Sequence, residues 1–336
     1  MSSNAHFLTL DPEIAPLIAQ MPNRPQNLTI EEQRAALHAR FLQFQERMKP
    51  ELPSDSEYQV QDHLVPVDSG EIKVRCVMPI SSGPQETGPF PLLVWYHGGG
   101  YCLGSSDMDD FYLRTVAVKN RVVVVNVDYR LAPLFPFPTG VNDAYAALKW
   151  AAENATQLSA SLSRGFIVAG QSAGGNFSAS VALQARDDPF FAGRQLTGQL
   201  LQIPQVIHIR AQPEKYKTEL LSMDEVTDGP YLSKKDAERF SELYQADPLD
   251  PRYSVLLAPS HSGLPPAYIQ VSGLDPLRDE GILYEKVLRE SGVKTKLDVY
   301  PGLPHGGHII FPTTSLSAKV NQDFNAGLQW LLNRST

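Results

Sequence analysis

The chain has 336 residues, of which 42% are hydrophobic and 20% are charged, and its formal net charge is −8. This length accommodates one large α/β domain or two smaller ones. The acidic balance argues against nucleic acid or an anionic membrane as a partner. No run of 18 apolar residues is present and the N-terminus lacks the basic start of a signal peptide, so we expect a cytoplasmic protein without a membrane partner. The two cysteines, Cys76 and Cys102, do not indicate a disulfide framework.

The clearest early element is a helix over residues 29–48. Thr29 is a candidate N-cap and Glu32 follows at the spacing of a capping box. Apolar residues then recur at four- and three-residue steps, at Leu37, Phe41, Phe44 and Met48. Because this helix precedes every strand, it must pack against a later part of the chain.

Strand and helix patterns alternate from about residue 57 onward. Polar and apolar residues alternate from Glu71 to Val77, which is typical of a half-solvated strand. Continuous apolar runs, typical of strands covered on both faces, occupy residues 92–96 and 122–127. Further strands are predicted over 166–169, 198–203, 267–271 and 295–300, and helices over about 108–119, 141–154, 175–186 and 279–291. This alternation predicts an α/β fold with a mainly parallel sheet between layers of helices.

Residues 205–250 interrupt the alternation. The segment is more polar, contains a helical stretch from Lys234 to Tyr244 and has no convincing strand pattern. We interpret it as an insertion that joins residues 1–55 to form a helical cap over the C-terminal edge of the sheet, where ligands bind in open α/β sheets. Residues 56–204 and 251–336 would then form the core.

The most informative stretch is Gly170-Gln171-Ser172-Ala173-Gly174, which lies between a buried strand and an alanine-rich helix. A serine at a glycine-flanked strand-to-helix turn is held with its Oγ exposed above the sheet. The motif by itself occurs by chance in roughly one chain of this size in ten. Its context therefore carries the prediction that Ser172 is a nucleophile.

A second glycine-rich stretch, His97-Gly98-Gly99-Gly100, follows the predicted strand 92–96. Consecutive glycines leave backbone N–H groups accessible to a substrate carbonyl, as an oxyanion hole requires. Tyr101 and Cys102 come next and are candidate substrate contacts. His97 is expected to organise the loop.

An acid and a base should follow the nucleophile, each after a later strand. Asp275 follows the strand 267–271 and His305 follows the strand 295–300, which makes them the candidates. Asp279 is expected to cap the next helix, and Asp298 lies inside a strand and is expected to point away from the site.

Three other histidines compete with His305 for a functional role. His308 is expected either to line the pocket or to face solvent. His208 and His261 fall in the insertion or in a loop, and both are expected at the surface. Asp143 is expected to be a structural partner of Arg130 or of a backbone amide.

Several motifs together resemble the hormone-sensitive-lipase group of carboxylesterases, which has the α/β-hydrolase fold. They are HGGG, Asp128-Tyr129-Arg130-Leu131-Ala132-Pro133, the Ser172 stretch, Asp275-Pro276-Leu277-Arg278-Asp279 and a terminal Pro-His-Gly. The resemblance implies a mainly parallel eight-stranded sheet flanked by helices, a helical cap, and hydrolysis of short- to medium-chain acyl esters. It implies no metal and no cofactor. It also implies roles for Ser172 as nucleophile, Asp275 as acid, His305 as base, and the amides of Gly99, Gly100 and Ala173 as the oxyanion hole.

Three positions depart from that pattern. Gln171 stands where the group usually has an acidic residue, Leu134 replaces a glutamate, and Gly307 replaces a phenylalanine after His-Gly. The last change suggests a looser pocket wall beside His305. None of the three touches the predicted triad.

Two alternative functions stay open at this point. The same triad serves amidases and arylformamidases, which cleave a C–N bond. The plant gibberellin receptors resemble the group but lack the catalytic histidine, so a receptor is disfavoured by the presence of His305. The expected partner is a small ester substrate, and a homodimer is one of the assemblies that the sequence leaves undecided.

Overall fold

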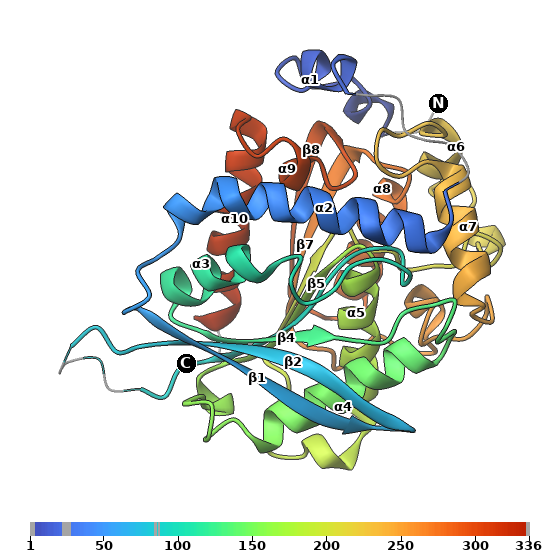
Figure 1. Ribbon diagram of the computed structural model, residues 1–336. Coiled ribbons are helices and arrows are strands. Elements are labelled where there is room, and N and C mark those ends of the chain that lie inside the picture. Colours follow the sequence, from blue (N-terminus) through green and yellow to red (C-terminus); the bar gives the residue numbers. More distant parts are fainter. Residues whose placement is uncertain (1–3, 22–27, 84–85, 87, 334–336) are drawn as a thin grey trace.

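The computed structural model describes residues 4–21, 28–83, 86 and 88–333, so parts of the predicted cap segment, residues 1–3 and 22–27, lie outside the described chain. One eight-stranded sheet runs through the molecule in the order β1-β2-β4-β3-β5-β6-β7-β8 (Figure 1). Its strands are β1 Tyr58–Val67, β2 Gly70–Pro79, β3 Leu92–Tyr96, β4 Val123–Asp128, β5 Phe166–Gln171, β6 Gly198–Gln202, β7 Ala267–Leu274 and β8 Thr295–Pro304. The pairs β1·β2 and β2·β4 are antiparallel and the other five pairs are parallel. The expected mainly parallel α/β sheet is thus confirmed, although β1 was not predicted.

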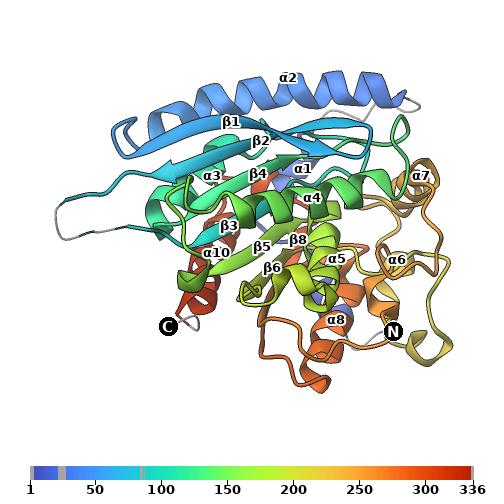
Figure 2. The ribbon, with the colours of Figure 1, turned by 90° about the horizontal axis from the view of Figure 1, so that it is seen from below.

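Helices cover both faces of the sheet, as Figure 2 shows from below. The helices α3 (Asp110–Asn120) and α10 (Ser315–Leu332) lie on one face, and α4 (Thr139–Glu153), α5 (Ala173–Asp187) and α8 (Arg278–Glu290) lie on the other. Alternate residues of β3 serve the two layers: Leu92, Val94 and Tyr96 belong to the core beneath α4 and α5, and Leu93 and Trp95 to the core beneath α3 and α10. A sheet buried on both faces explains the continuous apolar runs in its central strands.

The helix α2 (Ile30–Met48) crosses beside the loops at the C-terminal edge of the sheet (Figure 1). It begins with the expected capping box, in which Thr29 and Glu32 exchange hydrogen bonds. Arg34 on this helix donates from Nε to the carbonyl oxygen of Cys102 and from Nη2 to that of Ala132, both at 2.8 Å. A helix that precedes every strand is therefore anchored on the loops that follow β3 and β4.

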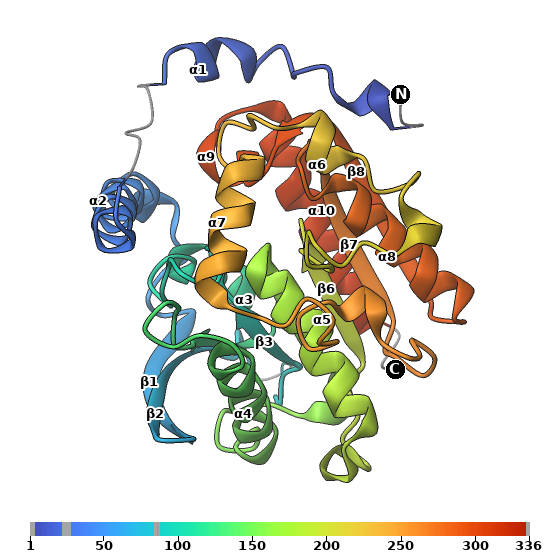
Figure 3. The same ribbon diagram turned by 90° about the vertical axis from the view of Figure 1, so that its right-hand side faces the viewer.

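The segment 205–250 contains two α-helices, α6 (Ser222–Glu225) and α7 (Lys234–Tyr244). Figure 3 shows α7 standing beside the C-terminal edge of the sheet, with α2 on its far side from α8. Arg239 on α7 donates to the carbonyl oxygen of Leu28, just before α2, at 2.7 Å. The two segments that we assigned to a cap are therefore bonded to each other.

The N-terminal arm, residues 4–21 with the short helix α1 (Ala15–Ala19), packs on the other end of the chain (Figure 3). Ile14 is fully buried in a cluster with Leu303 and Phe311, which precede and follow His305 in the sequence. A Cβ on Gly302 would stand 2.3 Å from the carbonyl oxygen of Thr9, so the arm approaches β8 as closely as a glycine permits. Within the described residues, we find no helix with the length and apolarity needed to span a bilayer.

The contact between α10 and β7 gives a test of this packing. A Cβ on Gly327 would lie 1.9 Å from the ring of Tyr268, which is itself fully buried. We expect Gly327→Ala to lower the free energy of unfolding by about 1–3 kcal/mol, because the added methyl overpacks the core. Urea denaturation would measure this change in the free energy of unfolding. The exposed neighbour Ala326 supplies the control, since Ala326→Gly should cost only the ordinary helix-propensity difference of about 1 kcal/mol; an unchanged or increased stability of Gly327→Ala would contradict the prediction.

Candidate active site

Ser172 occupies a sharp turn between β5 and α5. Its backbone has φ 53° and ψ −116°, a strained conformation for a residue with a side chain, and its N–H donates to the carbonyl oxygen of Gln202 at 2.9 Å. The turn is possible because two glycines flank it. A Cβ on Gly174 would lie 1.9 Å from the carbonyl oxygen of Tyr96, and one on Gly170 would lie 2.4 Å from that of Gly174. The two flanking glycines are thus required by close backbone approach, as their spacing predicted.

The structure brings the three predicted side chains of the triad together. Nε2 of His305 lies 3.0 Å from Oγ of Ser172, and Nδ1 of His305 lies 2.7 Å from Oδ2 of Asp275. Both distances are within hydrogen-bond range. The imidazole therefore bridges a hydroxyl and a carboxylate, although these three residues are far apart in the sequence.

Parallel strands explain why the three groups meet. The carboxyl ends of β5, β7 and β8 lie at one edge of the sheet, and Leu274 pairs with Pro304 directly before Asp275 and His305. Asp275 is 1% exposed, and its Oδ1 accepts a hydrogen bond from the N–H of Leu277 at 2.8 Å. The carboxylate is thereby fixed with its other oxygen directed at the imidazole.

The loop of glycines after β3 lies beside this turn, because Tyr96 pairs with Gly170. Gly99 has φ +122° and Gly100 has φ +59°, and a Cβ on Gly99 would lie 2.1 Å from the carbonyl oxygen of Leu103. Both conformations are accessible to glycine and rare for other residues. Within the described residues, no acceptor is bonded to the N–H groups of Gly99, Gly100 or Ala173, so three backbone donors remain available near Ser172.

Comparison with known proteins identifies the group to which this site belongs. Residues 93–309 match a family described as having the alpha/beta hydrolase fold. An AB hydrolase superfamily protein of Schizosaccharomyces pombe is 37% identical over 97% of this chain and 95% of its own length. The carboxylic ester hydrolase LipN of Mycobacterium tuberculosis is 38% identical over 82% of this chain and 71% of its own length. The crystal structure of a vibralactone cyclase superposes with a TM-score of 0.95 at 43% identity, covering 98% of this chain and 97% of that one.

The chain belongs to the hormone-sensitive-lipase-like carboxylesterases of the α/β-hydrolase fold. It is accordingly a carboxylic ester hydrolase. This esterase has no metal-binding arrangement among its described residues, in which no three His, Cys, Asp or Glu side chains are grouped as ligands would be.

The two residues that follow the three glycines of the esterase are turned into the core. Tyr101 has φ +64° and is 1% exposed, and its ring stacks on that of Tyr244 at 4.1 Å between centroids. Its hydroxyl donates to Oε1 of Gln205 at 3.1 Å. Cys102 is fully buried, and burial raises the pKa of its thiol to about 12. The predicted contact of these two side chains with substrate therefore finds almost no accessible surface in this conformation.

His308 lies beside the base, in the short helix α9 (Gly307–Ile310). It is 7% exposed and its Nδ1 has no hydrogen-bond partner in the described structure. The preceding Gly307 is also buried, and a Cβ there would lie 2.8 Å from Cδ1 of Leu303. The side chains of Leu303 and Pro304 thus occupy the space next to Gly307, contrary to the looser wall that the sequence suggested.

The prediction that two other histidines lie at the surface was wrong. His208 and His261 are 4% and 5% exposed, not at the surface. Nδ1 of His208 accepts from the N–H of Arg210 at 3.0 Å, and Nε2 of His261 lies 2.9 Å from the carbonyl oxygen of Val255. Both imidazoles are therefore engaged with local backbone and lie outside the triad.

Three carboxylates near the site have structural partners. Asp279 lies in the first turn of α8, as expected, and its side chain also accepts from the N–H groups of Leu221 and Ser222 at 3.0 and 2.8 Å, at the start of α6. Asp298 accepts from the hydroxyl of Tyr268 within the sheet, at 2.7 Å. As expected, Asp143 is the partner of Arg130, through its backbone N–H and its guanidinium. None of them competes with Asp275 for the imidazole.

Sequence reasoning gave no role to the buried Glu280. Its Oε2 accepts from the N–H groups of Val206 and Ile207 at 3.2 and 3.0 Å, and burial raises the pKa of its carboxyl well above the usual range. These bonds hold the segment after β6 beside the nucleophile turn. Its position directly after the motif Asp275–Asp279 was the available signal.

A groove of about 320 Å³ lies elsewhere on the molecule. It is lined by His208, Ile209, Arg210, Glu238, Ser241, Glu242, Gln245, Ala246 and Pro248. Glu238 and Glu242 share one side of α7, and Phe240 lies on another, where its ring packs on Gly100. The groove is therefore separate from Ser172.

The buried His308 makes stability depend on pH. Burial, with a smaller effect of the nearby His305, lowers the pKa of His308 from 6.5 to about 4. Between these values the unfolded chain binds a proton that the folded chain excludes, so the free energy of unfolding falls as the pH is lowered from 6.5 toward 4, by up to about 3 kcal/mol from this group. We expect His308→Asn to show a shallower loss of stability over this range in urea titrations. If the free energy of unfolding fell equally steeply with pH in the variant and in the wild type, the prediction would be contradicted.

Proposed function

We propose that this esterase uses Ser172 as its nucleophile, His305 as general base and acid, and Asp275 as the orienting carboxylate. The observation that carries the proposal is the continuous hydrogen-bonded path from Asp275 through His305 to Ser172, at 2.7 and 3.0 Å. A serine hydroxyl is a weak nucleophile unless a neighbouring base removes its proton. The backbone strain at Ser172 is consistent with this role, because strained conformations cluster at sites where they serve function.

The reaction proceeds in two halves. Oγ of Ser172 attacks the ester carbonyl while its proton passes to Nε2 of His305, and Asp275 stabilises the resulting imidazolium. The C–O bond to the alcohol then breaks, and the alcohol leaves with the proton from Nε2. In the second half, water loses a proton to His305 and attacks the acyl-enzyme, which releases the carboxylic acid and returns the proton to Ser172.

The N–H groups of Gly99, Gly100 and Ala173 bind the negative oxygen of both tetrahedral intermediates. Each such donor, when preorganised, contributes about 2.7–4 kcal/mol to the transition state. The helix α5 begins at Ala173, so the positive end of its dipole points at the same place. Their freedom from other acceptors supports the assignment.

We further propose that residues 1–55 and 205–250 cap this site and that the substrates carry short to medium acyl chains. Space behind the glycine loop is filled by aromatic rings that are at most 1% exposed, those of Tyr101, Phe177, Tyr244 and Tyr253. A Cβ on Gly100 would lie 2.5 Å from the ring of Phe240, so α7 packs directly on the loop. Rings packed this tightly limit the room for a long chain.

Ring closure is a second candidate activity, favoured by the high similarity to the vibralactone cyclase. A lactone is an internal ester, and it forms when a hydroxyl of the bound acyl group replaces water in the second half of the reaction. The same three side chains would move the same protons. A hydroxyacyl ester substrate distinguishes the two outcomes, because hydrolysis yields the free acid and cyclisation yields the lactone.

The nucleophile is tested by Ser172→Ala. We expect the variant to be folded, with hydrolysis of nitrophenyl butyrate reduced by roughly 10⁴-fold or more, because the attacking oxygen is gone. Circular dichroism would establish that the fold is intact. Ser180→Ala, which removes a buried hydroxyl within α5, is the control and should retain activity. Retained turnover in Ser172→Ala would remove the nucleophile assignment.

The substrate class is tested with a series of nitrophenyl esters from acetate to palmitate. We expect kcat/KM to fall beyond about eight acyl carbons, because the buried aromatic side chains behind the glycine loop leave little room for a longer chain. Matched amide substrates should be cleaved far more slowly than the esters. A rise of activity with chain length would indicate a lipase, and comparable amide cleavage would indicate an amidase or arylformamidase.

A further inference from the structure

Gln171, the residue before the nucleophile, makes a buried contact that the mechanism above does not use. It is 4% exposed, and its Nε2 donates to Oδ1 and Oδ2 of Asp109 at 3.0 and 3.3 Å. Asp109 is 6% exposed and lies at the start of α3, where its side chain makes no capping bond. Its Oδ2 also accepts from Nε1 of Trp95 at 2.8 Å. One buried carboxylate thus joins β3, β5 and the loop that ends at α3.

The contact between Gln171 and Asp109 connects the two ends of the glycine loop. The loop leaves β3 after Tyr96, carries the three glycines and ends at Asp109. A Cβ on Gly98 would lie 3.2 Å from both Cγ and the carbonyl oxygen of Gln171, so this side chain runs along the start of the loop on its way to Asp109. Gln171 therefore contacts the loop at its beginning and at its end.

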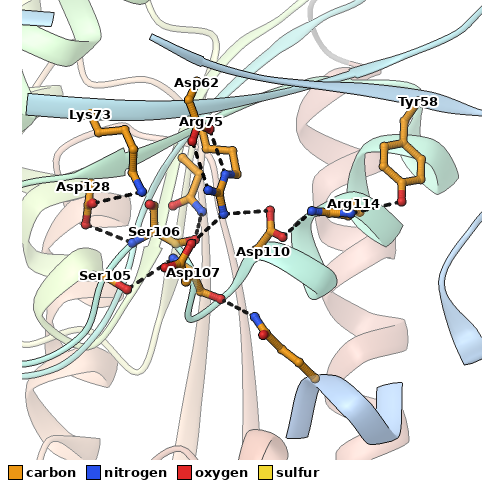
Figure 4. Close-up of polar contacts among 12 residues, drawn as sticks. Tyr58, Asp62, Lys73, Arg75, Ser105, Ser106, Asp107, Asp110, Arg114 and Asp128 are labelled. Carbon is orange, nitrogen blue, oxygen red and sulfur yellow. Dashed lines mark hydrogen bonds and ion pairs between the residues drawn. The ribbon is translucent and has the colours of Figure 1, made fainter. Parts of the chain in front are cut away.

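An ion-pair network holds the same loop from its outer side (Figure 4). Arg75 on β2 donates from Nη1 to Oδ1 of Asp107 at 2.6 Å, and from Nε and Nη2 to the carboxylate of Asp62 at 2.9 and 3.0 Å. The N–H of Ser106 donates to Oδ1 of Asp128 at 3.0 Å. Because residues 106 and 107 are fixed by this network, Gln171 is bonded to a segment that has little freedom to follow it.

The surroundings of Asp109 favour an amide as its partner. Burial raises the pKa of Asp109, and the hydrogen bonds from Trp95 and Gln171 and the nearby His97 act in the opposite direction. A second carboxylate in this place would oppose ionisation of the first. The other titratable groups that sense its charge are the phenols of Tyr112 and Tyr129.

We propose that the Gln171–Asp109 hydrogen bond is a positioning contact that sets the distance between the two halves of the oxyanion hole. One half, the amides of Gly99 and Gly100, lies on the loop that ends at Asp109. The other half, the amide of Ala173, lies two residues after Gln171 in the nucleophile turn. Neither side chain of the pair touches the substrate, and the inference rests on the proposed function of the three amides.

The consequence is an effect on kcat more than on KM. Oxyanion donors act only when they lie within about 0.2 Å of 2.9 Å from the position where charge develops. The ground-state carbonyl depends less on this spacing, so weakening the contact lowers transition-state binding while substrate binding is largely kept.

An exchange of the two groups tests the proposal. Gln171→Glu places two carboxyls in contact, which can remain bonded only while they share a proton. We expect its kcat for nitrophenyl butyrate, divided by that of the wild type at the same pH, to fall by up to roughly tenfold per pH unit as that proton is lost. In Asp109→Asn/Gln171→Glu the amide and the carboxylate have changed places. The new amide nitrogen at position 109 donates to the new carboxylate at position 171, while the amide oxygen still accepts from Trp95. This double variant should recover most of kcat and the wild-type pH profile.

Two further variants keep the test decisive if Gln171→Glu does not fold. Gln171→Met keeps the shape without the hydrogen bond, and we expect about tenfold lower kcat with nearly unchanged KM. The matched control is Gln199→Glu. Gln199 is a fully buried glutamine near the start of β6, far from the end of this strand that pairs with Gln171, and its Nε2 donates to the carbonyl oxygen of Pro265 at 3.1 Å. This control should lose stability without a pH-dependent change in relative kcat.

The outcomes separate the inference from the proposed function. Wild-type kcat in folded Gln171→Glu at every pH and in Gln171→Met would overturn the positioning role, as would a folded double variant that does not recover. If the relative kcat of Gln171→Glu does not depend on pH while Ser172→Ala is inactive, the positioning role is overturned and the assignment of the triad stands. Turnover that persists in Ser172→Ala would instead overturn the proposed function, whatever the Gln171 variants show.

Discussion

The site depends on how closely the start of α5 approaches the end of β3. A Cβ on Gly174 would collide with the carbonyl oxygen of Tyr96, so α5 can begin this close to β3 only because residue 174 has no side chain. This approach sets the turn that holds Ser172 in its strained backbone conformation, and it places the first turn of the helix beside the loop that leaves Tyr96. The proposed nucleophile and the proposed backbone donors are thus brought together by one backbone contact, which does not involve the side chains of Asp275 or His305.

The loops at this edge are fixed from several directions, which suits chemistry that requires preorganised donors. Arg34 of α2 bonds two backbone carbonyls on either side of β4, and Gln45 of the same helix donates to the carbonyl oxygen of Asp107 at 3.1 Å. On the opposite side, Phe240 of α7 packs on Gly100. The helices that would govern access to the site are therefore also supports of the glycine loop. A change in either helix is expected to affect both the range of substrates and the rate of the chemical step.

Much of this architecture could be predicted because the decisive patterns are local. Buried runs gave the central strands, the capping box gave the start of α2, and the motif order placed Ser172, Asp275 and His305 after three parallel strands. The missed strand β1 lies at the sheet edge, where few of its residues are buried and Leu64 is 63% exposed, so it lacks a clear alternation. The burial of His208, the inward turn of Tyr101 at positive φ and the Gln171–Asp109 contact depend on neighbours distant in the chain. No periodicity within a segment records such contacts.

The burial of Ile14 between β8 and α9 has a consequence for biosynthesis. The arm that carries Ile14 is made well before Leu303 and Phe311, which enclose it, because these two residues lie nearly the whole described chain further on. At about 5–20 residues per second, the interval is on the order of tens of seconds. Throughout that time the arm's apolar side chains have no native surface to cover, and they are available to chaperones. Docking of the arm would then follow the synthesis of β8 and α9, and it would cover the loop that carries His305 only at that stage.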